Sequence, residues 1–303
     1  MKKLFLFILC GLLCVTGCKK DELASGKTGN LRWTLSTDGT LTISGIGKMP
    51  DYNTSPLPWI EHRDKITGVI IDDGVTFIGD CAFYECTSLT SVTIPNSVIS
   101  IGNYAFNGCI GLTSVTIPNS IKTIGVRAFS DCIGLKSINI PNSITTIGPS
   151  VFRNCISLTS ITIPNSVTDI EGGTFANCTG LTSIIIPNSV RYIGWGAFGG
   201  CSSLTSIIIP NSVTSIEESA FAACVSLTSF TIGNSVTTIG GWAFSFCTNL
   251  TEIINESVIP QTIEAHVFLS TDISSCTLRV PEASIEAYRT ALWWQYFGNI
   301  VAI

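Results

Sequence analysis

The chain has 303 residues, of which 12% are charged and 45% are apolar, and its formal net charge is −5. An acidic chain without a stripe of lysine and arginine lacks the positive surface that binds phosphate backbones, so we exclude nucleic-acid partners. The remaining polarity comes largely from serine, threonine, asparagine and glycine, which indicates a surface wetted by hydroxyl and amide groups rather than by charge.

Residues 1–17 have the pattern of a signal peptide. Lys2 and Lys3 precede an apolar run over residues 4–15 that is too short to span a bilayer. The run ends in V-T-G-C, which resembles the lipobox of bacterial lipoproteins. The resemblance implies cleavage before Cys18 and a durable lipid anchor on its sulfur and its new amino group. The alternative is an ordinary secretory signal with an incidental cysteine. No other apolar run is long enough to span, so the lipid is the only membrane attachment that we expect.

Residues 18–30 are predicted to form a lipidated, flexible tether, because residues 24–30 are rich in glycine and serine. The charged residues K-K-D-E directly after Cys18 look like the lipoprotein export signals of one large group of Gram-negative gut and oral bacteria. That resemblance implies a lipid-anchored protein on the outer face of the outer membrane, exposed on the cell surface. The alternative is that these charges only keep the tether solvated.

Residues 31–65 are predicted to form an N-terminal cap. Apolar and polar residues alternate on both sides of an Asp38-Gly39 turn, a pattern typical of a β-hairpin. A repetitive fold needs atypical units at its ends, and we assign that role to this hairpin. The alternating apolar residues are Leu31, Trp33, Leu35, Leu41 and Ile43.

A 23-residue repeat dominates residues 66–275. Phenylalanine recurs every 23 positions, a cysteine follows three residues later, and a leucine follows three residues after the cysteine. The segment T-S-(I/V)-x-I-P-N-S-(V/I) recurs between them. The repeated residues are Phe83, Phe106, Phe129, Phe152, Phe175, Phe198, Phe221 and Phe244, with Cys86, Cys109, Cys132, Cys155, Cys178, Cys201, Cys224 and Cys247.

Residues 158–178 illustrate one repeat. Isoleucines alternate with hydroxyl residues over 159–163, which predicts a short strand. Pro164 ends the strand because it has no N–H to donate, and the Asn-Ser pair after it favours a turn. Phe175 and Cys178 are predicted to point into the interior from a second turn. One unit cannot bury its apolar face alone, so the repeats must stack into a solenoid.

The motif L-x-x-(I/V)-x-I-P-x-S-V-x-x-I-G-x-x-A-F-x-x-C resembles the BspA-like branch of leucine-rich repeats over residues 66–268. The resemblance implies a right-handed superhelix of stacked short strands and turns. Gly233 replaces the proline, Glu171 and Glu217 replace the glycine, and the unit ending at Phe268 has a one-residue insertion. None of these departures changes the core positions before residue 250.

Residues 276–303 are predicted to form a C-terminal cap. A last repeat-like strand ends before Pro281, residues 284–293 favour a short helix, and residues 300–303 favour a closing strand. We expect three aromatic residues to cover the exposed end of the core, namely Trp293, Trp294 and Phe297.

The chemistry-bearing residues argue against catalysis and against a metal or other cofactor. One cysteine per coil does not supply the clustered ligands that zinc needs, and cysteine is often buried, so we expect a column of free, buried thiols. A bridge between adjacent coils stays open on geometry. His62 and His266 are the only histidines, each lies near a cap, and no serine motif comes with a base. We therefore expect no enzyme activity.

Stacked strands create an extended surface, which favours a binding function. Serines such as Ser114 and Ser137 should line the sheet and keep it soluble. Variable positions beside the A-F core hold large side chains that we take as candidate ligand-binding residues, although they could equally pack against a neighbouring coil. These candidates are Tyr104, Arg127, Trp195 and Trp242.

The family resemblance implies a non-catalytic scaffold on the cell surface that adheres to host matrix proteins or to other cells. The alternative is a surface lipoprotein that captures glycans for nutrient uptake, and a structural role in the envelope is a third hypothesis. A cluster of exposed aromatic residues with neighbouring carboxylates and amides would favour the glycan alternative.

Overall fold

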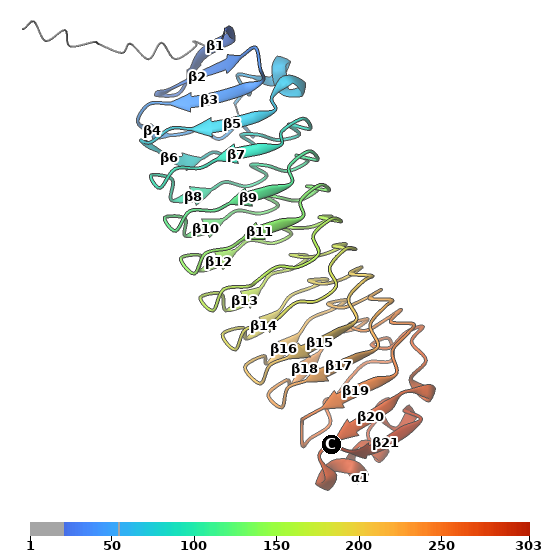
Figure 1. Cartoon of the computed structure of the whole chain (residues 1–303). Coiled ribbons are helices and arrows are strands. Elements are labelled where there is room, and N and C mark those ends of the chain that lie inside the picture. The colour runs from blue at the N-terminus through green and yellow to red at the C-terminus, as the bar shows by residue number, and fades with distance from the viewer. Residues whose placement is uncertain (1–20, 54) are drawn as a thin grey trace, which may run out of the picture.

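The computed structural model describes residues 21–53 and 55–303, which form one elongated solenoid of stacked coils (Figure 1). The N-terminal and C-terminal caps lie at opposite ends of the solenoid. The predicted signal peptide, residues 1–17, and Cys18 lie outside the described residues. Within the described part of the chain, no helix is long and apolar enough to cross a membrane.

Three antiparallel strands close the N-terminal end, namely β1 (Glu22–Thr28), β2 (Leu31–Ser36) and β3 (Thr40–Ser44). The β2–β3 pair confirms the predicted hairpin. The prediction of a flexible tether up to residue 30 is wrong, because β1 pairs with β2. A Cβ at Gly26 would lie only 2.8 Å from Nε1 of Trp33, so the small residues of β1 permit its close approach to the indole.

Each regular coil contributes to two parallel ladders, which the P-N-S turn separates. We call the side formed by the T-S-(I/V)-x-I segments the sheet face. Its strands are β5 (Gly68–Ile71), β7 (Ser91–Thr93), β9 (Ser114–Thr116), β11 (Ser137–Asn139), β15 (Ser206–Ile209), β17 (Ser229–Ile232) and β19 (Glu252–Asn255). The second ladder contains β4 (Gly47–Lys48), β6 (Val75–Ile78), β8 (Ser100–Ile101), β10 (Thr123–Ile124), β12 (Thr146–Ile147), β13 (Asp169–Ile170), β14 (Tyr192–Ile193), β16 (Ser215–Ile216) and β18 (Thr238–Ile239).

The A-F-x-x-C turns form the third side of each coil, which we call the turn side. The N–H of Tyr104 donates to the carbonyl of Val126 in the following coil at 2.8 Å. In the second ladder the bonds run the other way, since the N–H of Gly125 donates to Ile101 of the preceding coil at 2.9 Å. Two positions per turn have positive φ, as at Tyr104 (55°) and Gly108 (72°). The turns therefore satisfy their backbone groups between coils without forming a third sheet.

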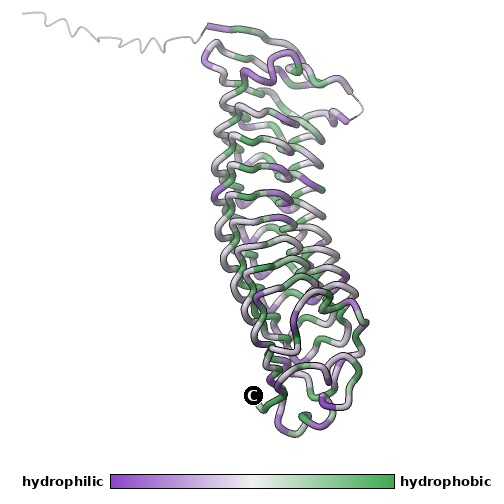
Figure 2. Tube along the Cα trace, turned by 90° about the vertical axis from the view of Figure 1, so that its right-hand side faces the viewer, coloured by the Kyte–Doolittle hydropathy of each residue, from purple (hydrophilic) through white to green (hydrophobic). Residues whose placement is uncertain are grey.

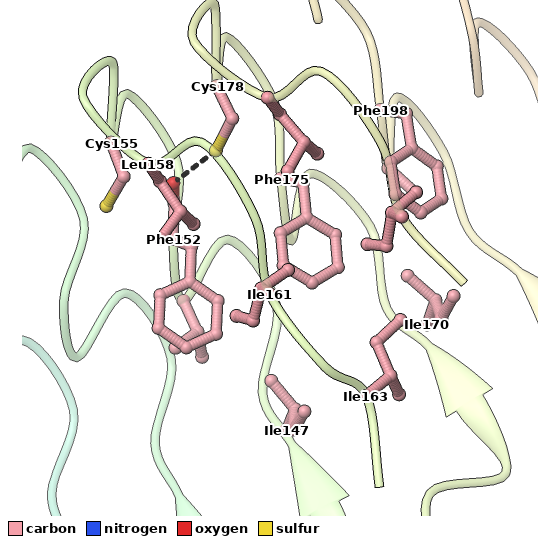
Figure 3. Packing of buried hydrophobic residues seen from close by; sticks show 14 of the residues in the cluster. Ile147, Phe152, Cys155, Leu158, Ile161, Ile163, Ile170, Phe175, Cys178 and Phe198 are labelled. Atoms are coloured by element: carbon pink, nitrogen blue, oxygen red, sulfur yellow. Dashed lines mark hydrogen bonds between the residues drawn. The ribbon is translucent and has the colours of Figure 1, made fainter. Parts of the chain in front are cut away.

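A column of stacked phenylalanine rings runs along the interior. From Phe83 to Phe244 the ring centroids of successive coils lie 5.1–6.1 Å apart, and each ring is buried. Figure 3 shows part of this column with the isoleucines that surround it. At the N-terminal end, the buried Trp59 stacks on Phe83 at 5.9 Å. Figure 2 shows hydrophobic segments recurring in successive coils along the solenoid.

The repeated cysteines are buried free thiols, as predicted. Each thiol from Cys109 to Cys247 donates to the phenylalanine carbonyl of the preceding coil, with Sγ···O distances of 3.1–3.4 Å. Figure 3 shows this bond between Cys178 and Phe152. Burial raises the pKa of the Cys178 thiol to about 12, so it stays protonated and able to donate. A small apolar side chain that also donates explains the choice of cysteine here.

The C-terminal cap contains β20 (Thr277–Val280), helix α1 (Ile285–Thr290) and β21 (Asn299–Ala302). β21 pairs in parallel with β20, so the predicted closing strand is confirmed. The helix is shorter than the predicted 284–293. Short 3-10 helices span Glu282–Ser284 and Trp294–Tyr296 in the cap, and Ile60–Lys65 and Ile273–Ser275 outside it.

Aromatic side chains close the C-terminal end of the interior. Trp294 and Phe297 are buried and meet the Phe268 ring edge-on, at centroid distances of 5.9 and 5.4 Å. The closing role predicted for both residues is confirmed, whereas Trp293 is only half-buried. Nε1 of Trp294 also donates to the carbonyl of Gln261 at 2.8 Å, which fastens the irregular segment after the last regular coil.

Candidate functional site

The four predicted ligand-binding residues lie along the turn side, but they do not form one cluster. Tyr104 and Arg127 occupy equivalent positions in adjacent coils, and the Arg127 guanidinium carbon lies 5.8 Å from the centroid of the Tyr104 ring. Trp242 shares their position in the repeat but lies six coils beyond Tyr104, or about 29 Å at the usual strand spacing. Trp195 lies one residue earlier in its coil.

The position shared by Tyr104, Arg127 and Trp242 has a left-handed backbone. Their φ values are 55°, 52° and 57°, whereas glycine fills the same position as Gly173 and Gly196. A left-handed residue with a Cβ costs about 1–2 kcal/mol, a cost that glycine avoids. Ser150 and Ser219 share this left-handed conformation, so the backbone position does not itself select large side chains.

The two tryptophans differ in how much of the indole is covered. Trp242 stacks on His266 with a centroid distance of 5.2 Å and an interplanar angle of 7°, and it is 37% exposed. Trp195 is 55% exposed, and the neighbouring positions of the preceding coil are Gly172 and Gly173, which have no side chain to cover it. Trp195 is thus the more accessible of the two, although sequence reasoning grouped them together.

The sheet face carries the expected line of exposed serines, but isoleucines at the variable position interrupt its hydroxyl character, beginning with Ile70 of the first coil, which is 39% exposed. Ile185 is 82% exposed and Ile208 is 67% exposed, at equivalent positions of adjacent coils. Their neighbours along this line are threonines, because Thr162 bridges to Ile185 and Ile208 pairs with Thr231. Ile185 and Ile208 lie about 5 Å apart, and together they form an exposed apolar patch between these threonines.

A hollow of about 370 Å³ lies beside this patch, and its lining includes Ile208, Pro210, Ser212 and Glu256. The equivalent serine of earlier coils donates to the preceding coil, as Ser189 does to the carbonyl of Val167 at 2.7 Å. Ser212 Oγ is buried but has no hydrogen-bond partner among the described residues. The hollow therefore combines apolar and polar side chains, and the Ser212 hydroxyl group beside it is buried without a partner in the described part of the chain.

Sequence reasoning missed Ile185 and Ile208 because it treated the variable residue of T-S-(I/V)-x-I as part of the scaffold. That residue is Ile70, Thr93, Thr116, Asn139 and Thr162 in earlier coils, so isoleucine in two successive coils was a detectable departure. The structure adds the reason, since this position faces solvent in every coil from residue 93 to residue 208.

The described residues hold no group of three histidine, cysteine or acidic side chains placed to bind a metal ion. What the surfaces offer is exposed apolar and aromatic side chains, hydroxyl groups and amides on a rigid backbone. Such groups bind a partner by burial and hydrogen bonding.

The fold and these surfaces define a leucine-rich-repeat solenoid. The chain belongs to the BspA-type leucine-rich repeat family, since the model of the BspA type leucine rich repeat region matches in six copies over residues 61–181 and 168–289. This family and fold typically serve as non-catalytic binding scaffolds. A search of curated proteins found no match.

Solved structures of bacterial leucine-rich repeat proteins are similar to this chain. A leucine rich cell surface protein from Faecalibacterium prausnitzii is 26% identical, covers 93% of this chain and 95% of its own, and has a TM-score of 0.52. The T. pallidum leucine rich repeat protein is also 26% identical, covering 74% and 90%, with a TM-score of 0.50. A leucine-rich repeat protein from Bacteroides ovatus is 23% identical, covering 90% and 89%, with a TM-score of 0.58, and supports the fold alone.

Proposed function

We propose that this protein is a lipid-anchored adhesion scaffold on the outer surface of the outer membrane, which binds a protein of the host matrix or of another cell. The observation that carries the proposal is the apolar patch of Ile185 and Ile208 beside the hollow that contains Ser212. The family membership and the cell-surface description of the Faecalibacterium prausnitzii protein support the location.

The chemistry of the patch favours a protein partner over a glycan. Aliphatic side chains on a flat sheet gain by being buried against another apolar surface, while sugars are better held by aromatic rings and carboxylates. No aromatic side chain lies among the residues that line the hollow beside Ile208. The hydroxyl groups around the patch would form the polar rim of such an interface.

The proposed anchor is the lipid on Cys18. Only three residues separate Cys18 from β1, and four peptide steps span at most about 14 Å, so the N-terminal cap would lie next to the membrane. Ile185 lies five coils beyond Ile70 of β5, or about 24 Å further along the solenoid. The patch would therefore lie several coils away from the anchored end of the solenoid.

The adhesion proposal is tested with the purified full-length chain on immobilised matrix proteins such as fibronectin, fibrinogen and laminin. We expect saturable binding to at least one of them and at least a tenfold loss in the double variant Ile185→Thr, Ile208→Thr. Threonine is native at this position in other coils, so the fold is preserved. The matched control is Ile99→Thr, which removes an exposed isoleucine from outside the patch. Equal binding by the double variant would refute the role of the patch.

The lipid anchor and the location on the cell surface are tested in cells. Radiolabelled palmitate should label the wild-type protein and not Cys18→Ala, and the variant should leave the membrane fraction. Protease added to intact cells should digest the solenoid. Protection of the solenoid until the outer membrane is broken would contradict surface exposure.

A further inference from the structure

A second pocket lies on the turn side, where the N-terminal cap meets the first coils. Its volume is about 440 Å³, within the range of small-molecule sites, and its walls include Tyr84, Tyr104 and Asp80. Asn53 from the cap loop and Asn103 from the second turn are its other polar residues, while Cys81 and Val126 add to a mainly apolar wall. The pocket thus brings two aromatic rings, one carboxylate and two amides together, on a different side of the coil from the isoleucine patch.

Hydrogen bonds fix the polar groups of this pocket before any ligand arrives. One oxygen of Asp80 accepts the backbone N–H of Asn103 at 2.7 Å. The other accepts from Nδ2 of Asn103 at 3.0 Å and from Nδ2 of Asn53 at 3.4 Å. Oδ1 of Asn103 accepts the N–H of Val126 at 2.8 Å. A carboxylate has about four acceptor positions, so Asp80 can still accept a bond from a ligand hydroxyl.

The aromatic walls are also held in place. Tyr104 has its left-handed backbone tied to Val126 of the next coil, and the Arg127 guanidinium lies against its ring. Both Tyr84 and Tyr104 are half-buried, so part of each ring borders the pocket while the rest packs on the protein. A preorganised ring loses little entropy when a ligand stacks on it.

We propose that this pocket binds an uncharged pyranose sugar. The C–H groups on one face of a pyranose pack against an aromatic ring, and its hydroxyl groups bond to carboxylates and amides, which are the two kinds of group present here. Asp51, whose carboxylate accepts the N–H of Asp80 at 2.9 Å, adds a second negative charge at the pocket. That charge disfavours sugars that carry a carboxylate or sulfate.

A quaternary ammonium group is the main competing ligand, because cations also bind at aromatic rings beside carboxylates. The Arg127 guanidinium already lies over the Tyr104 ring, and a second cation there would meet like-charge repulsion. The geometry therefore favours the neutral sugar. This site goes beyond the proposed adhesion function and does not depend on it.

The test is saturation-transfer NMR on the purified full-length chain in detergent, with methyl glucoside, methyl galactoside and methyl mannoside as probes. At least one glycoside should bind with a dissociation constant on the order of 1 mM, because the pocket is small and open. Sodium glucuronate and choline chloride should bind at least about tenfold more weakly. Absence of glycoside binding, or tighter binding of choline, would overturn the proposal.

Three single variants locate the binding site. In each variant, one pocket residue is replaced by the residue that other coils have at the same position. They are Tyr104→Ser, as in Ser150 and Ser219, Tyr84→Asn, as in Asn107, and Asp80→Asn, as in Asn103. Each should weaken glycoside binding about tenfold or more without lowering the melting temperature beyond a few degrees. The control Phe246→Ala removes an exposed aromatic residue at a position that is Ala223 in the preceding coil, and should bind as wild type. Wild-type binding by all three pocket variants would place the sugar elsewhere and refute the assignment.

Discussion

The interior of the coils and their exposed positions follow opposite rules. In the interior, phenylalanine recurs without exception from Phe83 to Phe244, because each ring must stack on the next at nearly the same distance. On the sheet face, the equivalent outward residue varies among threonine, Asn139 and isoleucine, including Ile185 and Ile208, without any change in the backbone register. The repeat therefore specifies the scaffold, while departures from the repeat at exposed positions carry the information about partners.

The largest expected effect on stability comes from the buried thiols at alkaline pH. Burial raises the pKa of the Cys86, Cys132, Cys178 and Cys247 thiols to about 12, above that of an unfolded cysteine. A group with a raised folded pKa contributes stability that is complete below the unfolded pKa and is lost as the pH rises towards the folded pKa. At pH 10 the loss is about 1–2 kcal/mol for each such thiol.

We therefore expect the denaturant midpoint to stay constant up to about pH 8 and to fall steeply between about pH 9 and 11. Urea unfolding followed by circular dichroism at each pH measures this. Thiol reagents should also modify these cysteines only after unfolding. A flat stability profile up to pH 11 would contradict the burial of the cysteine column.

The next largest effect is expected for a change in the aromatic column. Phe152→Ala leaves a cavity between the rings of Phe129 and Phe175, which lie 6.1 and 5.7 Å from that of Phe152, and should cost about 3–5 kcal/mol of unfolding free energy. Thr162→Ala on the exposed sheet face is the matched control and should change the unfolding free energy by less than about 0.5 kcal/mol. Comparable losses of unfolding free energy in the two variants would contradict the claim that the interior positions are more constrained than the surface positions.

A smaller effect separates the two roles of the repeated cysteine. Cys178→Ala removes the thiol that donates to the Phe152 carbonyl at 3.1 Å and should cost about 1–2 kcal/mol. Cys178→Ser keeps a donor and should be less destabilising than alanine when both are measured by urea unfolding. A greater loss with serine would mean that apolar packing alone, and not the hydrogen bond, accounts for cysteine at this position.

The sequence predicts the fold well wherever the repeat itself carries the information. Phenylalanine, cysteine and leucine lie at their expected interior positions, because a period of 23 leaves only one register in which the coils can stack. The failure at β1 has a physical cause. Glu22–Thr28 turns small residues inward, so it has no hydrophobic alternation, and its pairing with β2 depends on the contact of Gly26 with Trp33.

The candidate sites are less predictable because they depend on contacts between coils and between a coil and the cap. Sequence reasoning selected Tyr104 and Arg127 separately, and only the structure shows that the two side chains pair. The sugar pocket could not be predicted, since Asn53 reaches Asp80 from the irregular cap loop, 27 residues away. Trp195 was selected correctly as exposed, but it is separated from Trp242 by two coils and by a one-residue offset within the turn.

The variant with the smallest expected effect on stability gives the most direct test of the adhesion proposal. The double variant Ile185→Thr, Ile208→Thr is measured on one preparation for both its unfolding free energy and its binding to the matrix protein that the wild type binds. We expect an unfolding free energy within about 0.5 kcal/mol of wild type, together with at least a tenfold loss of binding. A variant with wild-type stability and undiminished binding would contradict the claim that this exposed patch carries the function.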